Sequence, residues 1–484
     1  MTITIPRSLR LLTALALFVP GLPLIATTLN VGVGKTYPTI QSAIIQAQPG
    51  DTVLIHPGTY TTSTYIVEKN GTFGVDIVIR GVDQSSVIIE GPSSSMQFVD
   101  CSHITVENLT MRGQKGNALF FDDGGTIETP SRYITVRNIV FEDMEGASNV
   151  NTNFLKMAGV DDFSIISCQF DRGPVKSLCI DLVGCHDGFI HNCLLRGTTD
   201  GGIQAKGGSQ FIDIYNNTFV DCGDRAINIG GNTGLPFFRP ADATFEASNI
   251  NVYTNTFVRC RASIAFAGAV NSEVVNNTIV DPSAWPFRIL QESVDASRFE
   301  PCGNNIIQNN IIVFRNTLNA HFNVGPNTAP ETFTVSHNLW YNSDMPSRSN
   351  ENIAPVVETM SVYGQDPLFV NPTTDLSISS ISPAVGKGLD TIAPSRDKRN
   401  KRYASPPSIG AYEGATTTSV FENGTNEHRS ITRTTIGFIV RLPNDGQRRS
   451  CALYDLRGRL LRRFELDGGE HHVPAGLQEF LLVE

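Results

Sequence analysis

The sequence of 484 residues has no long apolar segment after its N-terminus and no excess of positive charge. Nothing beyond the first thirty residues is long and apolar enough to predict a bilayer-spanning helix. With 37 Lys and Arg against 47 Asp and Glu, the formal net charge is −10. This charge argues against a general nucleic-acid binder, because counterion release needs a cationic face. An acidic polysaccharide is not excluded, since a local basic groove can lie on an acidic body.

Long runs of helix-forming residues are also missing, and no pair of cysteines or Cys/His cluster has the spacing of zinc ligands. The N-terminus, MTITIPRSLRLLTALALFVPGLPLIATT, has two arginines, an apolar run and then small residues. This layout predicts a signal peptide over 1–26, cleaved after Ala26, because Pro20 and Pro23 shorten the apolar core below a membrane anchor. Nine cysteines suit an oxidising compartment, but Cys168 and Cys193 are expected to stack as small apolar residues without a bridge.

A repeat runs through the middle of the chain. Segments such as ITVENLTM, DIYNNTF and IIQNNII each alternate apolar residues, reach Asn or Cys and resume with an apolar residue. The mean step is about 29 residues, and period-2 alternation at that spacing predicts a solenoid of strands whose stacked amides bond along the axis. The longest steps predict loops at 228–247 and 281–303. The marker residues are Asn108, Asn138, Cys168, Cys193, Asn217, Asn255, Asn277, Asn310 and Asn338.

A short helix is predicted ahead of the first coil in TYPTIQSAIIQAQPGD. Pro38 suits the first helical position, Ile40, Ala43, Ile44 and Ala47 form one apolar stripe, and a solenoid needs such a cap. Here the chain resembles the right-handed parallel β-helix, or pectin lyase-like, superfamily. The resemblance extends to DPLFVNPTTDLSISSISPAVGKG and PPSIGAYEG and implies an all-β solenoid domain over 27–414.

The composition changes after Gly414. A polar linker over 415–430 is followed by a segment over 431–484 with strand signals and a Gly-Gly turn, and 415–484 contains nine arginines but no lysine. The segment resembles the C-terminal sorting domain of type IX secretion cargo through its DLRGRLL pattern, although the ending GLQEFLLVE departs from that family. This resemblance implies a small β-sandwich that engages the secretion machinery of a Gram-negative bacterium, which places the protein outside the cell or on its surface. An ordinary small β-sandwich is the alternative.

A second set of strands, about ten residues after each marker, carries the candidate site. Aligning LCIDLVG, GIQAKGG, AINIGGN, SIAFAGA and PFRILQE with their apolar residues inward predicts two outward columns. One column contains Asp181, Gln204, Asn228, Ala265 and Arg288, and its neighbour contains Val183, Lys206, Gly230, Ala267 and Leu290. Arg225 lies at the entrance of the next strand.

Breaking a uronate chain by β-elimination needs a cation on the carboxylate, a base for the adjacent proton and an acid for the leaving oxygen. Arginine suits the first task, and a lysine amine suits the second once burial or a nearby cation, here Arg225, lowers its pKa. The family resemblance implies Lys206 as the base, since β-helical lyases use lysine or arginine. The catalytic candidates are Lys206 and Arg225, and the substrate-binding candidates are Asp181, Gln204, Asn228, Arg288, and Phe237, Phe238 and Arg239 of the 228–247 loop.

Other readings stay open. A glycine-flanked lysine at a strand end is often a solvated turn residue, Arg225 could pair with Asp224 or Asp200, and Phe237 and Phe238 could be buried. A polygalacturonase-type hydrolase needs two separated carboxylates, and TTDGG offers Asp200 alone without a Gly-His-Gly motif. A non-catalytic glycan-binding or structural solenoid is also compatible. Calcium is not predicted, because Asp181 is isolated on this face, and we expect no cofactor and a monomer acting on an acidic polysaccharide.

Overall fold

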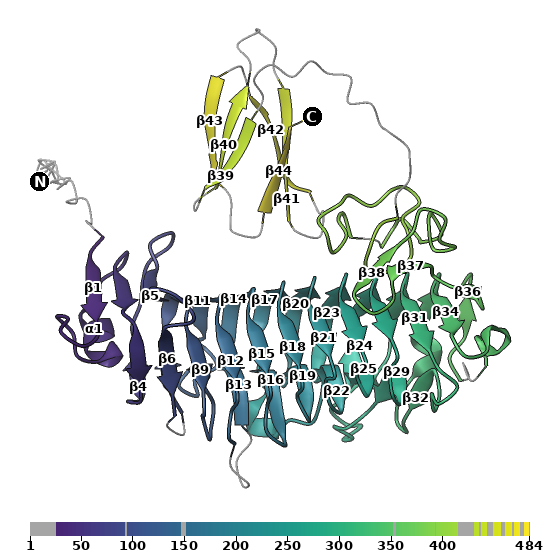
Figure 1. Ribbon diagram of the computed structural model, residues 1–484, viewed down its shortest axis with the longest axis horizontal. Coiled ribbons are helices and arrows are strands. Elements are labelled where there is room, and N and C mark those ends of the chain that lie inside the picture. The colour runs from purple at the N-terminus through teal and green to yellow at the C-terminus, as the bar shows by residue number, and fades with distance from the viewer. Residues whose placement is uncertain are drawn as a thin grey trace, which may run out of the picture.

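The structure is a computed structural model that describes residues 26–91, 94–146, 152–351, 355–392 and 394–414, together with strands between 430 and 483. Residues 26–414 contain a right-handed parallel β-helix, seen from the side in Figure 1. The predicted fold class is therefore confirmed. The predicted signal peptide, except Ala26, and the predicted linker, except Ser430, lie outside the described residues.

Three parallel sheets run the length of the solenoid, and each coil contributes a strand to each sheet along most of it. The sheet that carries the candidate site has ten strands. They are β4 (Thr64–Val67), β7 (Met96–Val99), β10 (Leu119–Asp122), β13 (Thr152–Ala158), β16 (Ser177–Val183), β19 (Gly201–Lys206), β22 (Arg225–Gly230), β25 (Ala262–Ala267), β29 (Trp285–Leu290) and β32 (Phe322–Val324).

The other two sheets complete the wall. The 14-stranded sheet comprises β1 (Thr28–Val31), β2 (Thr52–Ile55), β5 (Ile77–Gly81), β8 (Ser102–Glu107), β11 (Ser131–Arg137), β14 (Val160–Ile166), β17 (His186–His191), β20 (Ser209–Tyr215), β23 (Ala247–Tyr253), β26 (Ala269–Val270), β27 (Glu273–Val275), β30 (Ile306–Gln308), β33 (Thr334–Ser336) and β35 (Glu358–Thr359). The 12-stranded sheet comprises β3 (Gly58–Tyr60), β6 (Val87–Glu90), β9 (Thr110–Arg112), β12 (Val140–Glu142), β15 (Gln169–Asp171), β18 (Leu194–Arg196), β21 (Thr218–Val220), β24 (Thr256–Val258), β28 (Thr278–Val280), β31 (Ile311–Phe314), β34 (Leu339–Asn342) and β36 (Val362–Tyr363).

Inward side chains from successive coils stack on one another and fill the solenoid. Phe219 and Phe257 stack with ring centroids 4.7 Å apart, and Phe141 and Phe170 do so at 4.9 Å. Each large buried ring removes much apolar surface from water, which is the main favourable term in folding. The eight cysteines among the described residues are buried free thiols, so the expectation of no bridge between Cys168 and Cys193 is confirmed.

An asparagine ladder lies at the turn between the 14-stranded and 12-stranded sheets. Its amides are fully buried, and each backbone N–H donates to the side-chain oxygen of the next member, as from Asn277 to Asn310 at 2.9 Å. The side-chain nitrogen of each asparagine also donates to a carbonyl of the preceding coil, Val252 O for Asn277 Nδ2. The ladder joins five coils through Asn217, Asn255, Asn277, Asn310 and Asn338.

The first two predicted markers are one residue out of phase. Asn108 and Asn138 have left-handed backbone, with φ of 61° and 52°, and precede the ladder position. Leu109 and Ile139 occupy that position, since their carbonyls accept from the next coil as that of Cys168 does. The ladder is therefore apolar in the early coils, then Cys168 and Cys193, then asparagine.

A short helix covers the N-terminal end of the solenoid. Helix α1 (Ile40–Gln46) contacts β1, β2 and β4, and it begins after the N-cap Thr39, whose side chain accepts from the N–H of Ser42. Pro38 thus precedes the N-cap and is not the first helical residue, while the predicted apolar stripe is buried. Short 3-10 helices occur at η1 (Leu235–Phe237), η2 (Pro330–Thr332) and η3 (Pro346–Arg348), and β37 (Phe369–Asn371) pairs with β38 (Asp375–Ile378).

Residues 388–414 form a strap that returns along the ladder turn. Asn309 exchanges hydrogen bonds with Leu389, and Asn276 donates to the carbonyl of Ser408 at 3.0 Å. Farther along, the Lys398 amine donates to the carbonyl of Asn217 at 2.7 Å. The strap therefore ties together coils from Asn217 to Asn309, which lie far apart in sequence.

The C-terminal strands form two antiparallel sheets of three strands, as a small β-sandwich requires. One contains β39 (Ser430–Thr434), β40 (Gly437–Leu442) and β43 (Gly469–Pro474), and the other contains β42 (Leu460–Leu466), β41 (Arg449–Asp455) and β44 (Glu479–Val483). Among the described residues, no helix has the length and apolar character needed to span a membrane.

Replacing Asn277 by Ala should destabilise the solenoid by about 2–4 kcal/mol, because Val252 O and the Asn255 N–H lose their buried partner. The urea midpoint should fall accordingly. The matched control is Asn319→Ala, since Asn319 is exposed, and it should leave the midpoint unchanged. Equal midpoints for both variants would show that the ladder contributes little.

The strap should make stability depend on pH through Lys398. Burial of the amine lowers its pKa from 10.5 to about 7, so between about pH 7 and 10.5 the unfolded chain binds a proton that the folded chain does not. The free energy of unfolding should therefore rise with pH across this window, and below about pH 7 the full penalty remains. In Lys398→Met this rise should be smaller, as measured by urea unfolding at several pH values. An unchanged slope in the variant would contradict the assignment.

Candidate functional site

The outward face of the ten-stranded sheet brings the predicted residues into the expected columns. Asp181 pairs in register with Gln204, Gln204 with Asn228, Asn228 with Ala265 and Ala265 with Arg288. In the next column Val183 pairs with Lys206, Gly230 with Ala267 and Ala267 with Leu290. The predicted strand alignment is confirmed, and successive positions in a column are separated by about 4.8 Å.

Lys206 is the last residue of β19 and is half-buried. Its amine has no hydrogen-bond or ion-pair partner within the described part of the chain, whereas its carbonyl accepts from Ser209 and from the Gly184 N–H. A Cβ atom on Gly231 would lie 3.3 Å from Lys206 Cδ and 2.5 Å from the Gln204 amide nitrogen. Glycine at 231 therefore leaves the space through which the lysine side chain extends.

Arg225 lies five residues before Gly230, which is level with Lys206 on the neighbouring strand. The backbone of Arg225 therefore lies about 16 Å along the strand direction from Lys206. Its guanidinium lies back over the face, where Nη1 donates to Asn228 Oδ1 at 3.2 Å and Nη2 contacts Glu292 Oε1 at 2.5 Å. Nε is 3.4 Å from Asp224. The predicted pairing with Asp224 is present, but Glu292 is the closer partner.

Arg288 belongs to the same ion-pair network. It donates to Asn323 at 2.9 Å and lies 3.5 Å from Asp224 Oδ2, while the other oxygen of Asp224 contacts Arg261. The guanidinium carbons of Arg288 and Arg261 lie 4.8 Å and 5.2 Å from the Trp285 ring centroid. Burial and the nearby Arg225 lower the pKa of Arg288. Both arginines are therefore engaged by carboxylates, and with Arg261 three guanidinium groups share Asp224 and Glu292.

Asp181 lies under its neighbours and is 5% exposed. One carboxylate oxygen accepts from Asn153 at 3.2 Å and lies 3.7 Å from the Lys156 amine, and the other has no hydrogen-bond partner in the described structure. Direct contact between Asp181 and a substrate does not fit this burial, and the residue is better placed to hold Lys156. Sequence reasoning missed Lys156, although FLKMA has the same alternation one coil before LCIDLVG.

The predicted 228–247 loop packs over the turn that follows β16 and β19, and its three candidate residues differ. Phe237 is 69% exposed, whereas Phe238 is 1% exposed and packs against Phe299. The predicted role of these rings as a sugar platform is compatible with the exposure of Phe237. For Phe238 the prediction is wrong, because its ring is buried. Arg239 does not face the columns, because its guanidinium makes two hydrogen bonds to Asp161, at 2.6 Å and 2.7 Å. Its predicted role as a carboxylate ligand for substrate is corrected for that reason.

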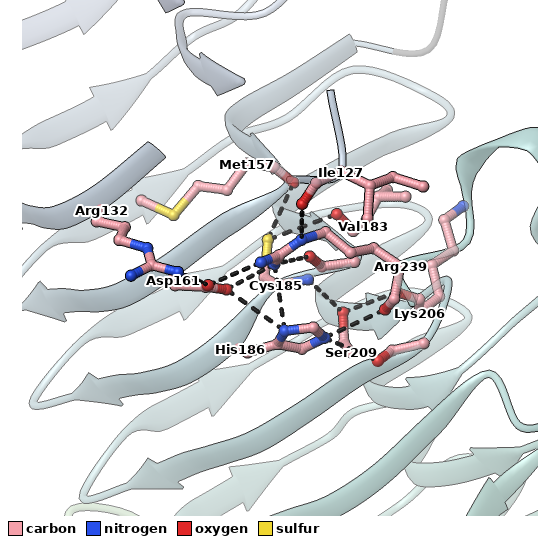
Figure 2. Close-up of polar contacts among 12 residues, drawn as sticks. Ile127, Arg132, Met157, Asp161, Val183, Cys185, His186, Lys206, Ser209 and Arg239 are labelled. Atoms are coloured by element: carbon pink, nitrogen blue, oxygen red, sulfur yellow. Dashed lines mark hydrogen bonds and ion pairs between the residues drawn. The ribbon is translucent and has the colours of Figure 1, made fainter. Parts of the chain in front are cut away.

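Figure 2 shows how this ion pair fastens the loop. His186 Nε2 contacts the carbonyl oxygen of Arg239 at 3.1 Å, and Arg239 Nη1 donates to the Gly184 carbonyl at 3.1 Å. Although burial opposes it, hydrogen bonds from Arg239 and His186 hold the pKa of Asp161 well below its usual range. The Lys206 side chain lies beside this cluster and extends away from it.

A buried carboxylate fastens two loops to the strand end that carries Lys206. Glu246 accepts from the N–H of Gly207 at 2.9 Å and from both the N–H and the hydroxyl of Thr233, at 2.9 Å and 2.7 Å. It also accepts from the Ser293 hydroxyl at 2.5 Å. Gly207 directly follows Lys206. Glu246 therefore links the position of Lys206 to the 228–247 loop through Thr233 and to the 281–303 loop through Ser293.

Among the described residues, no group of three or more His, Cys, Asp or Glu side chains is arranged to hold a metal ion. The acidic residues near the columns, Asp224 and Glu292, are instead engaged by arginines.

Comparison with known proteins agrees with this architecture. The family model described as "Right handed beta helix region" matches residues 94–239, which is less than half of the chain. The structure is similar to that of pectate lyase Pel9A, with 13% identity, a TM-score of 0.52 and coverage of 82% of this chain and 98% of that one. The likeness is one of fold.

Two other solved structures are similar over less of the chain. A rhamnogalacturonan lyase has 14% identity and a TM-score of 0.47, with 65% of this chain and 87% of that one covered. The lacto-N-biosidase of Eubacterium ramulus has 12% identity and a TM-score of 0.43, with 64% and 67% covered. No curated protein matches the chain.

Replacing Asp161 by Asn should cost about 3–5 kcal/mol of stability, because the buried guanidinium of Arg239 then loses the carboxylate that it is hydrogen-bonded to. Hydrogen exchange should increase across residues 231–246, and the added change Arg239→Met should recover part of the loss. The matched control is Arg132→Met. Arg132 also approaches Asp161, at 3.5 Å, but its side chain is 49% exposed, so we expect a loss within about 1 kcal/mol. Similar losses in the two single variants would contradict the account.

Proposed function

We propose that the protein is a polysaccharide lyase that cleaves a uronate-containing chain by β-elimination, with Lys206 as the base. The observation that carries this proposal is the unpaired amine of Lys206 on a face where the neighbouring cations Lys156, Arg225 and Arg288 all have carboxylate partners. An amine that is not engaged by a carboxylate of the protein can contact a bound substrate directly.

In the proposed reaction the neutral amine takes the proton on the carbon next to the uronate carboxylate. The electron pair of that C–H bond forms a carbon–carbon double bond, while the bond from the β-carbon to the glycosidic oxygen breaks. The leaving oxygen then takes up the proton that Lys206 has gained. Charge develops on the carboxylate in the transition state, where a fixed cation is most effective.

Arg225 is the proposed cation for that carboxylate. Its guanidinium donates to Asn228, which pairs in register with Gln204. The column that contains Gln204 and Asn228 is adjacent to the column that contains Lys206. A uronate group that binds there would take over donors now given to Asn228 and Glu292. Gln204, Arg288 and the exposed ring of Phe237 are the proposed contacts for neighbouring sugars, and a known pectate lyase shares the fold. We propose no cofactor and a monomeric enzyme.

Hydrolysis of the glycosidic bond is a second candidate, favoured by two acidic residues at the strand entrances. Local desolvation and the neighbouring Asp224 raise the pKa of Asp200, as a general acid requires. Asp224, however, is engaged by three arginines, which limits its availability as a base.

We also propose that the protein is exported by a Gram-negative bacterium to its surface or surroundings. The sequence signals for this are the N-terminal segment 1–26 and the C-terminal segment 431–484, which we assign to the signal peptide and to recognition by the secretion machinery. The antiparallel strands of the C-terminal segment are compatible with such a domain.

The test is the ultraviolet absorbance of unsaturated uronate after incubation of the full chain with alginate, polygalacturonate or chondroitin. Lys206→Ala should lower kcat by about 10²–10⁴-fold, the usual contribution of an acid–base residue. The matched control, Lys387→Ala, removes an exposed lysine just before the strap and should leave kcat unchanged.

Two results would overturn the lyase proposal. New reducing ends without ultraviolet absorbance would favour hydrolysis at Asp200. Binding of these polymers without any cleavage would identify a glycan-binding solenoid.

A further inference from the structure

The polar column of the candidate site continues toward the N-terminal end of the solenoid. Asp181 pairs in register with Lys156, and Lys156 with Phe120. One coil farther, Phe120 pairs with Gln97, which pairs with Tyr65. Alternate residues of each strand face the same way, so these side chains continue the outward column that contains Gln204.

Lys156 and Phe120 form a compact pair on this face. The Lys156 amine lies 5.7 Å from the centroid of the Phe120 ring, and the Lys156 side chain is 29% exposed. Asp181 holds the amine from below at 3.7 Å and is itself fixed by Asn153. An ammonium group has three donors, and a single contact at that distance leaves others directed to solvent.

The opposite end of the column offers no comparable place. The Trp285 ring is flanked by the guanidinium groups of Arg288 and Arg261, and those arginines share Asp224. The column also passes through Ala265, which is fully buried. A sugar chain that follows this column therefore meets a ring beside a part-exposed amine at Phe120 and Lys156, whereas at Trp285 the ring is already flanked by two guanidinium groups.

We infer that Lys156 and Phe120 form a second sugar subsite, in which the ring supports a pyranose face and the amine binds the carboxylate of a uronate residue. The substrate class rests on the proposed function. Lys156 lies two coils from Lys206, about 9.6 Å along the axis. A single sugar is shorter than this distance, so only an oligosaccharide reaches both positions.

Turnover on a series of uronate oligosaccharides of increasing length tests the inference. In Lys156→Met, which keeps the apolar stem, KM on long chains should rise about tenfold with kcat unchanged, as expected when binding energy alone is lost. The shortest substrates, which cannot reach Lys156, should show no change. Phe120→Leu should give the same length dependence, because it keeps apolar bulk but removes the ring.

The matched control is Lys387→Met, which removes the same charge from an exposed position just before the strap. It should not change KM at any length. An equal KM for wild type and Lys156→Met on long chains would overturn the subsite, as would a rise that is the same for every length.

A binding measurement separates this inference from the proposed reaction. Affinity for polygalacturonate and alginate is measured in the Lys206→Ala background, with and without Lys156→Met, at low and high salt. If no uronate polymer is cleaved by the wild type but Lys156→Met weakens binding about tenfold, the subsite holds and the lyase proposal fails. If cleavage is observed and binding is unchanged by Lys156→Met, the subsite alone fails.

Discussion

The hydrogen bonding of each coil to the next determines everything that the outer face can present. Parallel strands pair at one spacing of about 4.8 Å, and a shift by one residue would turn every side chain to the other side of the wall. The asparagine ladder fixes this register at a turn, because the Asn277 side-chain nitrogen donates both to Val252 O in the coil before it and to Asn310 Oδ1 in the coil after it. Outward side chains such as Gln204 and Asn228 are therefore placed by the core and the turns.

On the candidate face, most of the charge is matched locally. Arg225 contacts Glu292, Arg288 approaches Asp224, and Lys156 lies near Asp181. Paired charges position one another but have weak fields at a distance, since opposite signs cancel. Lys206 differs because its amine has no partner in the described structure, so the amine can contact a bound substrate.

Alternation and spacing were enough to predict the solenoid and the order of residues along its columns, because both follow from the period of two in a strand. The phase of the ladder was not predictable at Asn108 and Asn138. Asparagine suits both the left-handed turn position and the buried position beside it, and sequence alone does not separate them. Leu109 and Ile139 show that apolar residues also fill the buried position.

The loop residues were predicted less well for a different reason. Arg239 finds Asp161 across 78 residues of sequence, and no local pattern indicates such a partner. Phe238 is buried and packs against Phe299 of the 281–303 loop, while Phe237, its neighbour in sequence, is exposed. Lys156 followed the strand pattern and could have been found by extending the alignment by one coil.

Hydrogen bonds to one carboxylate join the 228–247 loop, the 281–303 loop and the end of the strand that carries Lys206. Glu246 is fully buried, and its oxygens accept from Gly207, Thr233 and Ser293, which belong to three separate segments. A buried carboxylate is tolerated only when such donors surround it, so loss of one donor weakens the hold on the others. The same few hydrogen bonds therefore hold both loops and the end of the Lys206 strand. The position of Lys206 depends on these loops as well as on its own strand.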